Sequence, residues 1–242
     1  MLLSLEHVAK TNWVGPYEKR TLVDVSLTLA PGDFVGVWGG HRSGKSTLLR
    51  VAAGLELPDS GVVRFDGRDL ASLSRVQRGE LRLGAIGLVR GEGPQSAEFD
   101  VADFVALPLL ARHSRRIARR RAMDLLRRME IVECHDVKWR SLSDTERALV
   151  SLAHGLVREP KLLLADDPTA GLDALQQEEV VRLLRAAAAE TGVAILTTVS
   201  AMSALAGAHE AFTLGDGRLL PVAEPDRGGN VIDFPAGGEQ RG

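Results

Sequence analysis

Short apolar runs recur along the chain, and glycine, proline or aspartate ends most of them. Runs of about four to eight residues with such boundaries are typical of strands, either buried on both faces or alternating between apolar and polar positions. The pattern predicts strands at residues 3–8, 22–29, 34–38, 62–65, 86–89, 162–165 and 193–197, and a hairpin turn at Asp216-Gly217. We predict a polar loop between the first two strands, and this loop contains Trp13 and Tyr17.

Helical periodicity, in which apolar residues recur every three or four positions, appears at residues 46–53, within residues 99–156 and at residues 174–189. Gly192 is expected to end the last of these helices. The inward face of that helix is predicted to consist of Leu175, Val180, Leu183, Leu184 and Ala187. Strands that alternate with helices imply an α/β fold with a largely parallel, doubly wound sheet.

An arginine-rich helix is predicted at residues 117–131. Its apolar face consists of Ala122, Leu125, Leu126 and Met129. Its other face carries Arg115, Arg116, Arg119, Arg120, Arg127 and Arg128. Such a face suits anionic lipid headgroups or nucleic acid, but we favour the interpretation that it is a solvated face of a peripheral helical subdomain.

Length and composition fit one domain with a subdomain. The chain has 242 residues, of which 45% are hydrophobic and 26% are charged, and this is enough to bury a full core. We place the domain at residues 1–223, its helical subdomain at about 92–157, and a flexible tail at 224–242, where glycine, proline and charged residues dominate. Residues 231–235 within the tail are a candidate docking peptide, although disorder is the favoured interpretation.

Charge and cysteine content narrow the function classes. The net charge of −2 gives no global argument for binding to nucleic acid or to a membrane surface. Cys134 is the single cysteine, which excludes an internal disulfide and suits a reducing compartment. The first residues lack the pattern of a signal peptide, and no apolar run approaches the roughly 20 residues needed to span a bilayer. We therefore expect a soluble chain.

A glycine-rich loop joins the strand at 34–38 to the helix at 46–53. It runs Gly39-Gly40-His41-Arg42-Ser43-Gly44-Lys45-Ser46-Thr47 and fits the phosphate-loop pattern G-x-x-x-x-G-K-S. Backbone N–H groups of such a loop surround phosphate oxygens, the lysine adds a positive charge, and the serine hydroxyl is a ligand of Mg²⁺. A carboxylate at the end of a neighbouring strand holds the same ion through water. Asp166, directly after residues 162–165, is placed for this role.

Further motifs make the chain resemble the ATP-binding subunit of an ABC transporter, over residues 1 to about 222. Leu142-Ser143 before a helix, residues 160–169 (PKLLLADDPT) and Leu172-Asp173 are similar to the signature, Walker B and D-loop of that family in order and spacing. Residues 105–110 (VALPLL) resemble the branch of macrolide exporters and lipoprotein-release ATPases. The resemblance implies a P-loop NTPase fold of ABC type, with a mostly parallel core sheet, an antiparallel β subdomain and an inserted α-helical subdomain.

The same resemblance implies ATP and Mg²⁺ as cofactors and an assembly around them. Two such subunits hold two ATP molecules head to tail, and each site combines the phosphate loop of one chain with the signature of the other. Ser143 and Asp173 are the residues of this chain at the signature and D-loop positions. Closure of the pair drives integral-membrane permease subunits, which places the chain at the cytoplasmic face of the cell membrane. No nucleic-acid partner is implied.

Several catalytic positions depart from the family pattern. The glutamate that polarises the attacking water is replaced by Asp167, whose carboxylate is one methylene shorter. The switch histidine falls on Ser200, which cannot carry a histidine's positive charge. The glutamine after the strand at 86–89 is replaced by Gly91. Arg42 replaces a loop glycine, and it strains the loop if that position requires a backbone that only glycine adopts easily.

The signature and the adenine-stacking position also depart. The signature L-S-G-G-Q is replaced by Leu142-Ser143-Asp144-Thr145-Glu146, which lacks both glycines. Ser143 and Glu146 have the spacing of a capping box, so this helix is expected to satisfy its own N-terminal donors. The aromatic position falls on Asn12, so that Trp13 or Tyr17 would have to stack on adenine.

Our hypothesis is an ATP-binding subunit of an ABC transporter complex whose own site hydrolyses ATP weakly or not at all. Asp167 is a weak substitute base, and Ser200 stands in for the switch histidine. A second, catalytically complete ATP-binding subunit is the favoured partner, and a homodimer is the other possibility. The alternative is a regulatory or structural nucleotide-binding module that acts through a membrane partner without transporting a substrate.

Overall fold

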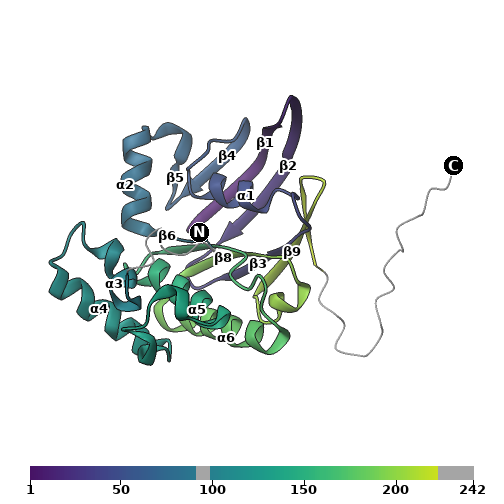
Figure 1. The fold of residues 1–242 in the computed structure, drawn as a ribbon. Coiled ribbons are helices and arrows are strands. Elements are labelled where there is room, and N and C mark those ends of the chain that lie inside the picture. Colours follow the sequence, from purple (N-terminus) through teal and green to yellow (C-terminus); the bar gives the residue numbers. More distant parts are fainter. Residues whose placement is uncertain (91–98, 223–242) are drawn as a thin grey trace.

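The computed structural model describes residues 1–90 and 99–222, so the predictions for Gly91 and for the tail lie outside the described residues. A six-stranded sheet forms the middle of the fold, with strand order β10-β9-β3-β8-β7-β6 (Figure 1). Its strands are β3 (Phe34–Trp38), β6 (Ile86–Arg90), β7 (Leu162–Asp166), β8 (Ala194–Val199), β9 (Glu210–Gly215) and β10 (Arg218–Pro221). All neighbouring strands are parallel except β9 and β10, which form the hairpin predicted at Asp216-Gly217.

A second, antiparallel sheet lies on one side of this central sheet. Its strand order is β2-β1-β4-β5, and its strands are β1 (Leu3–Val14), β2 (Tyr17–Leu29), β4 (Ser60–Phe65) and β5 (Arg68–Asp69). Helix α1 (Lys45–Ala52) packs between the two sheets, and α2 (Arg75–Ala85) lies beside the antiparallel sheet (Figure 1). The predicted antiparallel β subdomain is therefore present.

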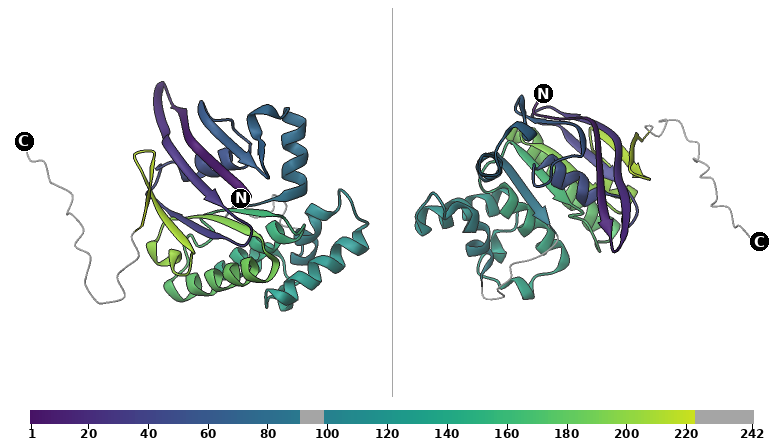
Figure 2. Two further views of the ribbon diagram at one scale, coloured as in Figure 1. Left: turned by 180° about the vertical axis from the view of Figure 1, so that it is seen from behind. Right: turned by 90° about the horizontal axis from the view of Figure 1, so that it is seen from above.

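Helices cover the opposite face of the central sheet (Figure 2). They are α3 (Val101–Ala106), α4 (Arg115–Arg128), α5 (Asp144–Leu156) and α6 (Ala174–Thr191). Short 3-10 turns complete the described elements: η1 (Leu70–Ser72), η2 (Leu107–Leu109), η3 (Val132–Cys134), η4 (Trp139–Ser141) and η5 (Met202–Leu205). Within the described residues, no helix is both long enough and apolar enough to cross a membrane.

Alternating side chains of the central strands divide the core into two parts. In β7, Leu162 and Leu164 pack with the antiparallel sheet and α1, whereas Leu163 and Ala165 pack with the helices on the other face. Because both faces are covered, β7 is apolar at every position before Asp166, as expected of a parallel sheet between two layers. The apolar runs in the sequence therefore locate the central strands correctly.

The predicted loop around Trp13 and Tyr17 is wrong. Strands β1 and β2 continue as a long antiparallel hairpin, in which Trp13 pairs with Glu18 and Val14 pairs with Tyr17. The first four residues of β2 are all exposed, so no burial pattern marks them as a strand. Backbone pairing between the two strands sustains the hairpin there.

The inward assignment of Leu175 is also wrong, because its side chain is 79% exposed. Leu175 precedes Val180 by five positions, which does not match the spacing of residues on one helical face. Glu178, Glu179 and Arg182 share its face and are exposed as well. Gly192 ends α6 as predicted, in the left-handed conformation with φ of 72°.

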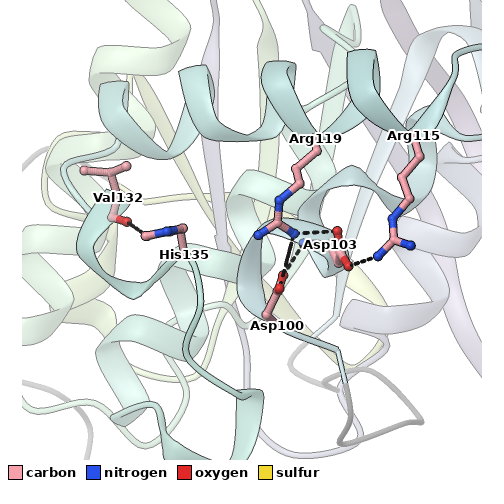
Figure 3. Close-up of polar contacts among 6 residues, drawn as sticks. All are labelled: Asp100, Asp103, Arg115, Arg119, Val132 and His135. Atoms are coloured by element: carbon pink, nitrogen blue, oxygen red, sulfur yellow. Dashed lines mark hydrogen bonds and ion pairs between the residues drawn. The ribbon is translucent and has the colours of Figure 1, made fainter.

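Helices α3 and α4 are joined by ion pairs (Figure 3). Nη1 of Arg119 lies 3.0 Å from Oδ1 of Asp100 and 2.5 Å from Oδ1 of Asp103, and Nη2 of Arg115 lies 2.6 Å from the other oxygen of Asp103. Burial raises the pKa of Asp103, but hydrogen bonds from both arginines outweigh it and leave that pKa below its usual value. Nearby, Nδ1 of His135 lies 3.0 Å from the carbonyl oxygen of Val132.

We expect Arg119→Ala to lower the free energy of unfolding by about 1–2 kcal/mol, because it leaves Asp100 and Asp103 partly buried with fewer donors. Urea denaturation followed by circular dichroism measures this change. Arg127→Ala is the matched control, because Arg127 pairs with Asp124 on an exposed part of the same helix. Its cost is expected to stay below about 0.5 kcal/mol. Equal costs for the two variants would contradict a bridging role of Arg119.

Candidate functional site

The glycine-rich loop lies where β3 ends at the edge of the central sheet and α1 begins. It borders a cavity of about 880 Å³. The strand ends of β7 and β8 reach the same cavity, as expected at the carboxyl edge of a parallel sheet. The lining residues are Asn12, Lys19, Thr21, all residues from 39 to 47, Asp166, Asp167 and Ser200. The structure thus brings together the loop and the three predicted residues from the neighbouring strands.

Two glycines of the loop have no room for a side chain. A Cβ atom on Gly39 would lie 2.8 Å from the carbonyl oxygen of Leu214. A Cβ atom on Gly44 would lie 2.6 Å from the carbonyl oxygen of Thr21, and the φ angle of Gly44 is 114°. The close approach of the loop to β2 and β9 therefore requires glycine at both positions.

Lys45 is a buried cation whose amino group points back into the loop. Its Nζ donates to the carbonyl oxygen of Gly39, to that of Gly40 at 3.2 Å, and to Oγ of Ser200 at 3.3 Å. The Oγ atom of Ser43 is buried and has no hydrogen-bond partner within the described residues. An unpartnered buried hydroxyl costs free energy, which an anionic ligand in the loop would recover. The loop therefore fits phosphate.

Ser46 and Asp166 both line the cavity. Ser46 is exposed, and Asp166 is half-buried and accepts a hydrogen bond of 2.8 Å from Oγ1 of Thr198. Both also border a smaller neighbouring cavity of about 250 Å³. Hydroxyl and carboxylate oxygens are the donors that Mg²⁺ prefers, so this pair fits that ion. Sequence reasoning missed Thr198, which orients Asp166 from the adjacent strand.

Both carboxylate oxygens of Asp167 are engaged by Ser200. Oγ of Ser200 donates to Oδ2, and its backbone N–H donates to Oδ1 at 3.3 Å. The backbone N–H of Asp167 donates to the carbonyl oxygen of Thr198 at 3.0 Å, and the φ angle of Asp167 is 49°. Lys45, Ser200 and Asp167 thus form a continuous hydrogen-bonded chain across the cavity.

Arg42 occupies the left-handed region of the backbone, with φ of 60°. Its carbonyl oxygen accepts a hydrogen bond of 2.8 Å from Nζ of Lys19, another cavity residue that sequence reasoning missed. The position therefore favours glycine, and a side chain there costs about 1–2 kcal/mol. Arg42 and its neighbour His41 are exposed, and both residues line the cavity.

Asn12 and Trp13, two of the residues expected near adenine, differ in their position relative to the cavity. Asn12 lines the cavity, and its Nδ2 donates to Oγ1 of Thr47 at 3.0 Å. Nη2 of Arg50 donates to the same oxygen at 3.0 Å, so the Thr47 hydroxyl connects α1 to the hairpin. Trp13 is 72% exposed and is not among the described residues that line the cavity. Its stacking role stays a prediction.

The capping box predicted at the start of α5 is confirmed. The backbone N–H of Ser143 donates to Oε2 of Glu146 at 2.7 Å, and the backbone N–H of Glu146 donates to Oγ of Ser143. Asp144 pairs with Arg147 at 3.1 Å. Sγ of Cys134 donates to Oε1 of Glu146 at 2.9 Å, and burial together with this carboxylate raises the pKa of the thiol to about 11.

Ser143 and Asp173 are not among the described residues that line the cavity. Asp173 caps α6 in the same way as Ser143 caps α5, since Oδ1 of Asp173 accepts from the backbone N–H of Gln176 at 2.9 Å. The structure thus places the signature and D-loop positions at helix N-termini outside the cavity.

Comparison with known proteins agrees with these motifs. A family model described as ABC transporter matches residues 22–170. Over 220 residues the chain is 35% identical to the lipoprotein-releasing system ATP-binding protein LolD of Bordetella pertussis, with 90% of this chain and 95% of that protein covered. It is also 35% identical over 237 residues to the macrolide export ATP-binding/permease protein MacB of Syntrophobacter fumaroxidans. That match covers 97% of this chain and 32% of MacB, so the chain spans about a third of this relative.

Solved structures show the same fold. A dimeric structure of the bacterial ABC transporter cassette MJ0796 superposes with a TM-score of 0.81 at 27% identity, covering 90% of this chain and 96% of that chain. A second dimeric structure of MJ0796, in a post-hydrolysis state bound to ADP and Pi, gives a TM-score of 0.80. The predicted combination of parallel core sheet, antiparallel subdomain and helices is thereby confirmed.

We expect Arg42→Gly to raise the free energy of unfolding by about 0.5–1 kcal/mol, because relief of the left-handed strain exceeds the added entropy of the unfolded chain. Arg42→Ala is the matched control, since it removes the charge and keeps the Cβ atom, and it is expected to leave stability within about 0.3 kcal/mol of the parent. Urea denaturation of the three proteins measures both effects. Equal stabilisation by glycine and alanine would show that charge, rather than backbone strain, sets the cost of Arg42.

Proposed function

Because the chain belongs to the ABC transporter family, as an ATP-binding cassette related to the LolD and MacB branch, we propose that it binds Mg-ATP at the glycine-rich loop, hydrolyses it weakly, and couples binding to conformational change in integral-membrane permease subunits. The observation that carries this proposal is the convergence of Lys45, Ser46 and Asp166 at one cavity. Each supplies a charge or a ligand atom that a magnesium-bound triphosphate needs.

Binding uses the parts of the cavity that match the family. The ammonium group of Lys45 and backbone N–H groups of the glycine-rich loop would bind the phosphates, and Ser46 and Asp166 would hold the ion directly or through water. When bound, Mg²⁺ neutralises charge on the phosphate oxygens. Phosphate oxygens compete for Lys45 with the carbonyl oxygens of Gly39 and Gly40, so binding requires Lys45 to give up part of its present hydrogen bonding.

Weak hydrolysis follows from how Asp167 is held. A general base needs a free carboxylate oxygen within hydrogen-bond reach of the attacking water. Both oxygens of Asp167 already accept hydrogen bonds from Ser200, so an attacking water would have to share these oxygens with Ser200. Ser200 also lacks the positive charge of a histidine. Loss of a positioned base costs roughly 10²–10⁴ in rate.

The altered signature supports weak hydrolysis also at the nucleotide site of the partner cassette, to which this signature would contribute. The N-terminus of α5 satisfies its own donors through the capping box, and Asp144 places a carboxylate in its first turn. A charge of that sign about 4 Å from a phosphate would repel it by roughly 4 kcal/mol at an effective dielectric of 20, before screening. The ion pair with Arg147 reduces this repulsion without restoring the two missing glycines.

One defect is the pair Asp167 and Ser200, and the other is the altered signature. They would lie on opposite halves of a composite site, and this favours a heterodimer. In a homodimer, each site would combine Asp167 and Ser200 with the altered signature. Paired with a complete cassette, the phosphate loop of this chain would face an intact signature. The dimeric MJ0796 structures support the pairing of cassettes as such. Association with permease subunits places the chain at the cytoplasmic face of the cell membrane as a peripheral subunit.

We expect Lys45→Ala to weaken Mg-ATP binding at least about 100-fold, because it removes the buried charge from the phosphate loop. Isothermal titration calorimetry of the chain and its complex measures the affinity. Lys161→Ala is the control, because Lys161 pairs with Asp66 on an exposed surface and does not line the cavity. A parent protein that gives no heat with Mg-ATP, in a complex whose activity survives Lys45→Ala, would instead support a regulatory or structural module.

We expect the isolated, Mg²⁺-saturated chain to hydrolyse ATP at less than about 0.1 per second, roughly 100-fold below a typical enzyme. The double variant Asp167→Glu/Ser200→His is expected to raise this rate at least about tenfold, because it frees a longer carboxylate from the serine and adds a titratable imidazole. A coupled phosphate-release assay measures both rates. Turnover of the parent chain at a rate typical of transporter ATPases would refute weak hydrolysis while leaving Mg-ATP binding intact.

A further inference from the structure

Helix α4 carries a strongly basic surface that nucleotide binding does not use. Between residues 112 and 128 there are eight arginines and one aspartate, although the whole chain has a net charge of −2. The helix projects at the edge of the molecule, away from the hairpin of β1 and β2 (Figures 1 and 2). Positive charge is thus concentrated on one peripheral element of an otherwise acidic chain.

The arginines of α4 fall into two groups. Arg115 and Arg119 bind the acidic residues of α3, as Figure 3 shows, and Arg127 pairs with Asp124. The others are exposed and form no ion pair with any residue that the structure describes. This second group is the outer arginine face, which consists of Arg116, Arg120, Arg121 and Arg128.

The outer arginine face lies on one side of α4, and the exposed Arg127–Asp124 pair lies on the same side. At 3.6 residues per turn its four side chains fall within an arc of about 140° on one side of the helix. The side chain of Ile117, which is 47% exposed, lies within the same arc. The opposite side of the helix packs into the core through Ala118, Ala122, Leu125 and Leu126. The core therefore fixes which side of α4 faces outward.

Folding alone does not favour this arrangement. Arg116 and Arg120 are like charges four positions apart, which destabilises a helix. Arg115 and Arg116 occupy the first turn, where the helix dipole disfavours positive charge, and no acidic residue occupies that turn. Ser114, at the N-cap, makes no side-chain capping bond. Arg115 is compensated by Asp103, whereas an external anion would relieve the repulsion between Arg116 and Arg120.

The chemistry of the face matches phosphate esters on a planar surface. Apart from Asp124, which lies within the same arc and pairs with Arg127, the charged residues on this side are arginines, whose planar guanidinium groups bind phosphate through two hydrogen bonds. A helix of this length extends about 20 Å, enough to contact several lipid headgroups. An exposed isoleucine among the arginines suits the boundary between headgroups and acyl chains. A long nucleic acid would also meet the acidic remainder of the chain, which disfavours it.

We propose that the outer arginine face of α4 binds anionic phospholipid headgroups at the membrane surface and so fixes the orientation of the cassette beneath its permease. The membrane location rests on the proposed function, whereas lipid binding itself does not require ATP. The face adds an electrostatic contact to those that the permease provides. Such contacts weaken as salt screens the surface charge.

Flotation of the full chain with lipid vesicles tests the proposal. We expect binding to vesicles of phosphatidylcholine with about 30% phosphatidylglycerol to exceed binding to pure phosphatidylcholine vesicles at least tenfold at about 0.1 M salt, and to fall steeply at about 0.5 M. The variant Arg116→Gln/Arg120→Gln/Arg121→Gln is expected to lose at least about tenfold in affinity for the anionic vesicles. Circular dichroism checks that it stays folded.

The matched control is Arg68→Gln/Arg75→Gln/Arg218→Gln, which removes the same charge from exposed positions outside α4 and is expected to change affinity less than about twofold. Lys45→Ala is expected to bind vesicles like the parent, so that failure of ATP binding and failure of lipid binding are distinguished. Equal losses for both triple variants, or no preference for anionic vesicles, would overturn the proposal. So would tighter binding of a single-stranded RNA oligonucleotide that depends on the same three arginines.

Discussion

The site depends on one constraint: a buried ammonium group has to be satisfied at the edge of a parallel sheet. Lys45 lies at the start of α1, and its charge is compensated by carbonyl oxygens of the loop that precedes it and by Ser200 from the neighbouring strand. Burial of a cation without such partners would be prohibitively costly. This requirement couples the conformation of the loop to the register of β3 against β8 and to the position of Ser200. Trp38 reinforces the coupling, because its Nε1 donates a hydrogen bond to the Ser200 carbonyl oxygen.

The same coupling connects Ser200 and Asp167, the two residues that we propose make hydrolysis weak. Ser200 accepts from Lys45 and donates to Asp167, so the cation of the phosphate loop and the second carboxylate are linked through one hydroxyl. A histidine at position 200 would not offer this short path, and a glutamate at position 167 would reach further into the cavity. Lys45, Ser200 and Asp167 together form a closed polar chain. Opening that chain is part of the free energy that any bound phosphate has to supply.

The sequence predicts the central sheet, the phosphate loop and the α5 capping box because each rests on local chemistry. Apolar runs mark strands covered on both faces, and Ser143 with Glu146 needs only one helical turn. The outer hairpin was missed because exposed strands held by backbone pairing carry no burial pattern. Lys19 and Thr198 were missed for a different reason, since their roles depend on which strands become neighbours in space.

Some residues that match the family are needed for the fold itself, so their presence is not evidence of nucleotide binding. The Thr47 hydroxyl accepts hydrogen bonds from Asn12 and Arg50, so it also stabilises the fold. The Asp166 carboxylate does the same by accepting a hydrogen bond from Thr198. Ser43 and Ser46 differ, because their hydroxyls form no hydrogen bond with any residue that the structure describes. Folding gives no reason for a buried, unpartnered hydroxyl at Ser43, whereas a bound phosphate would give it a hydrogen-bond partner. Ser43 therefore argues more strongly for a ligand than the lysine itself does.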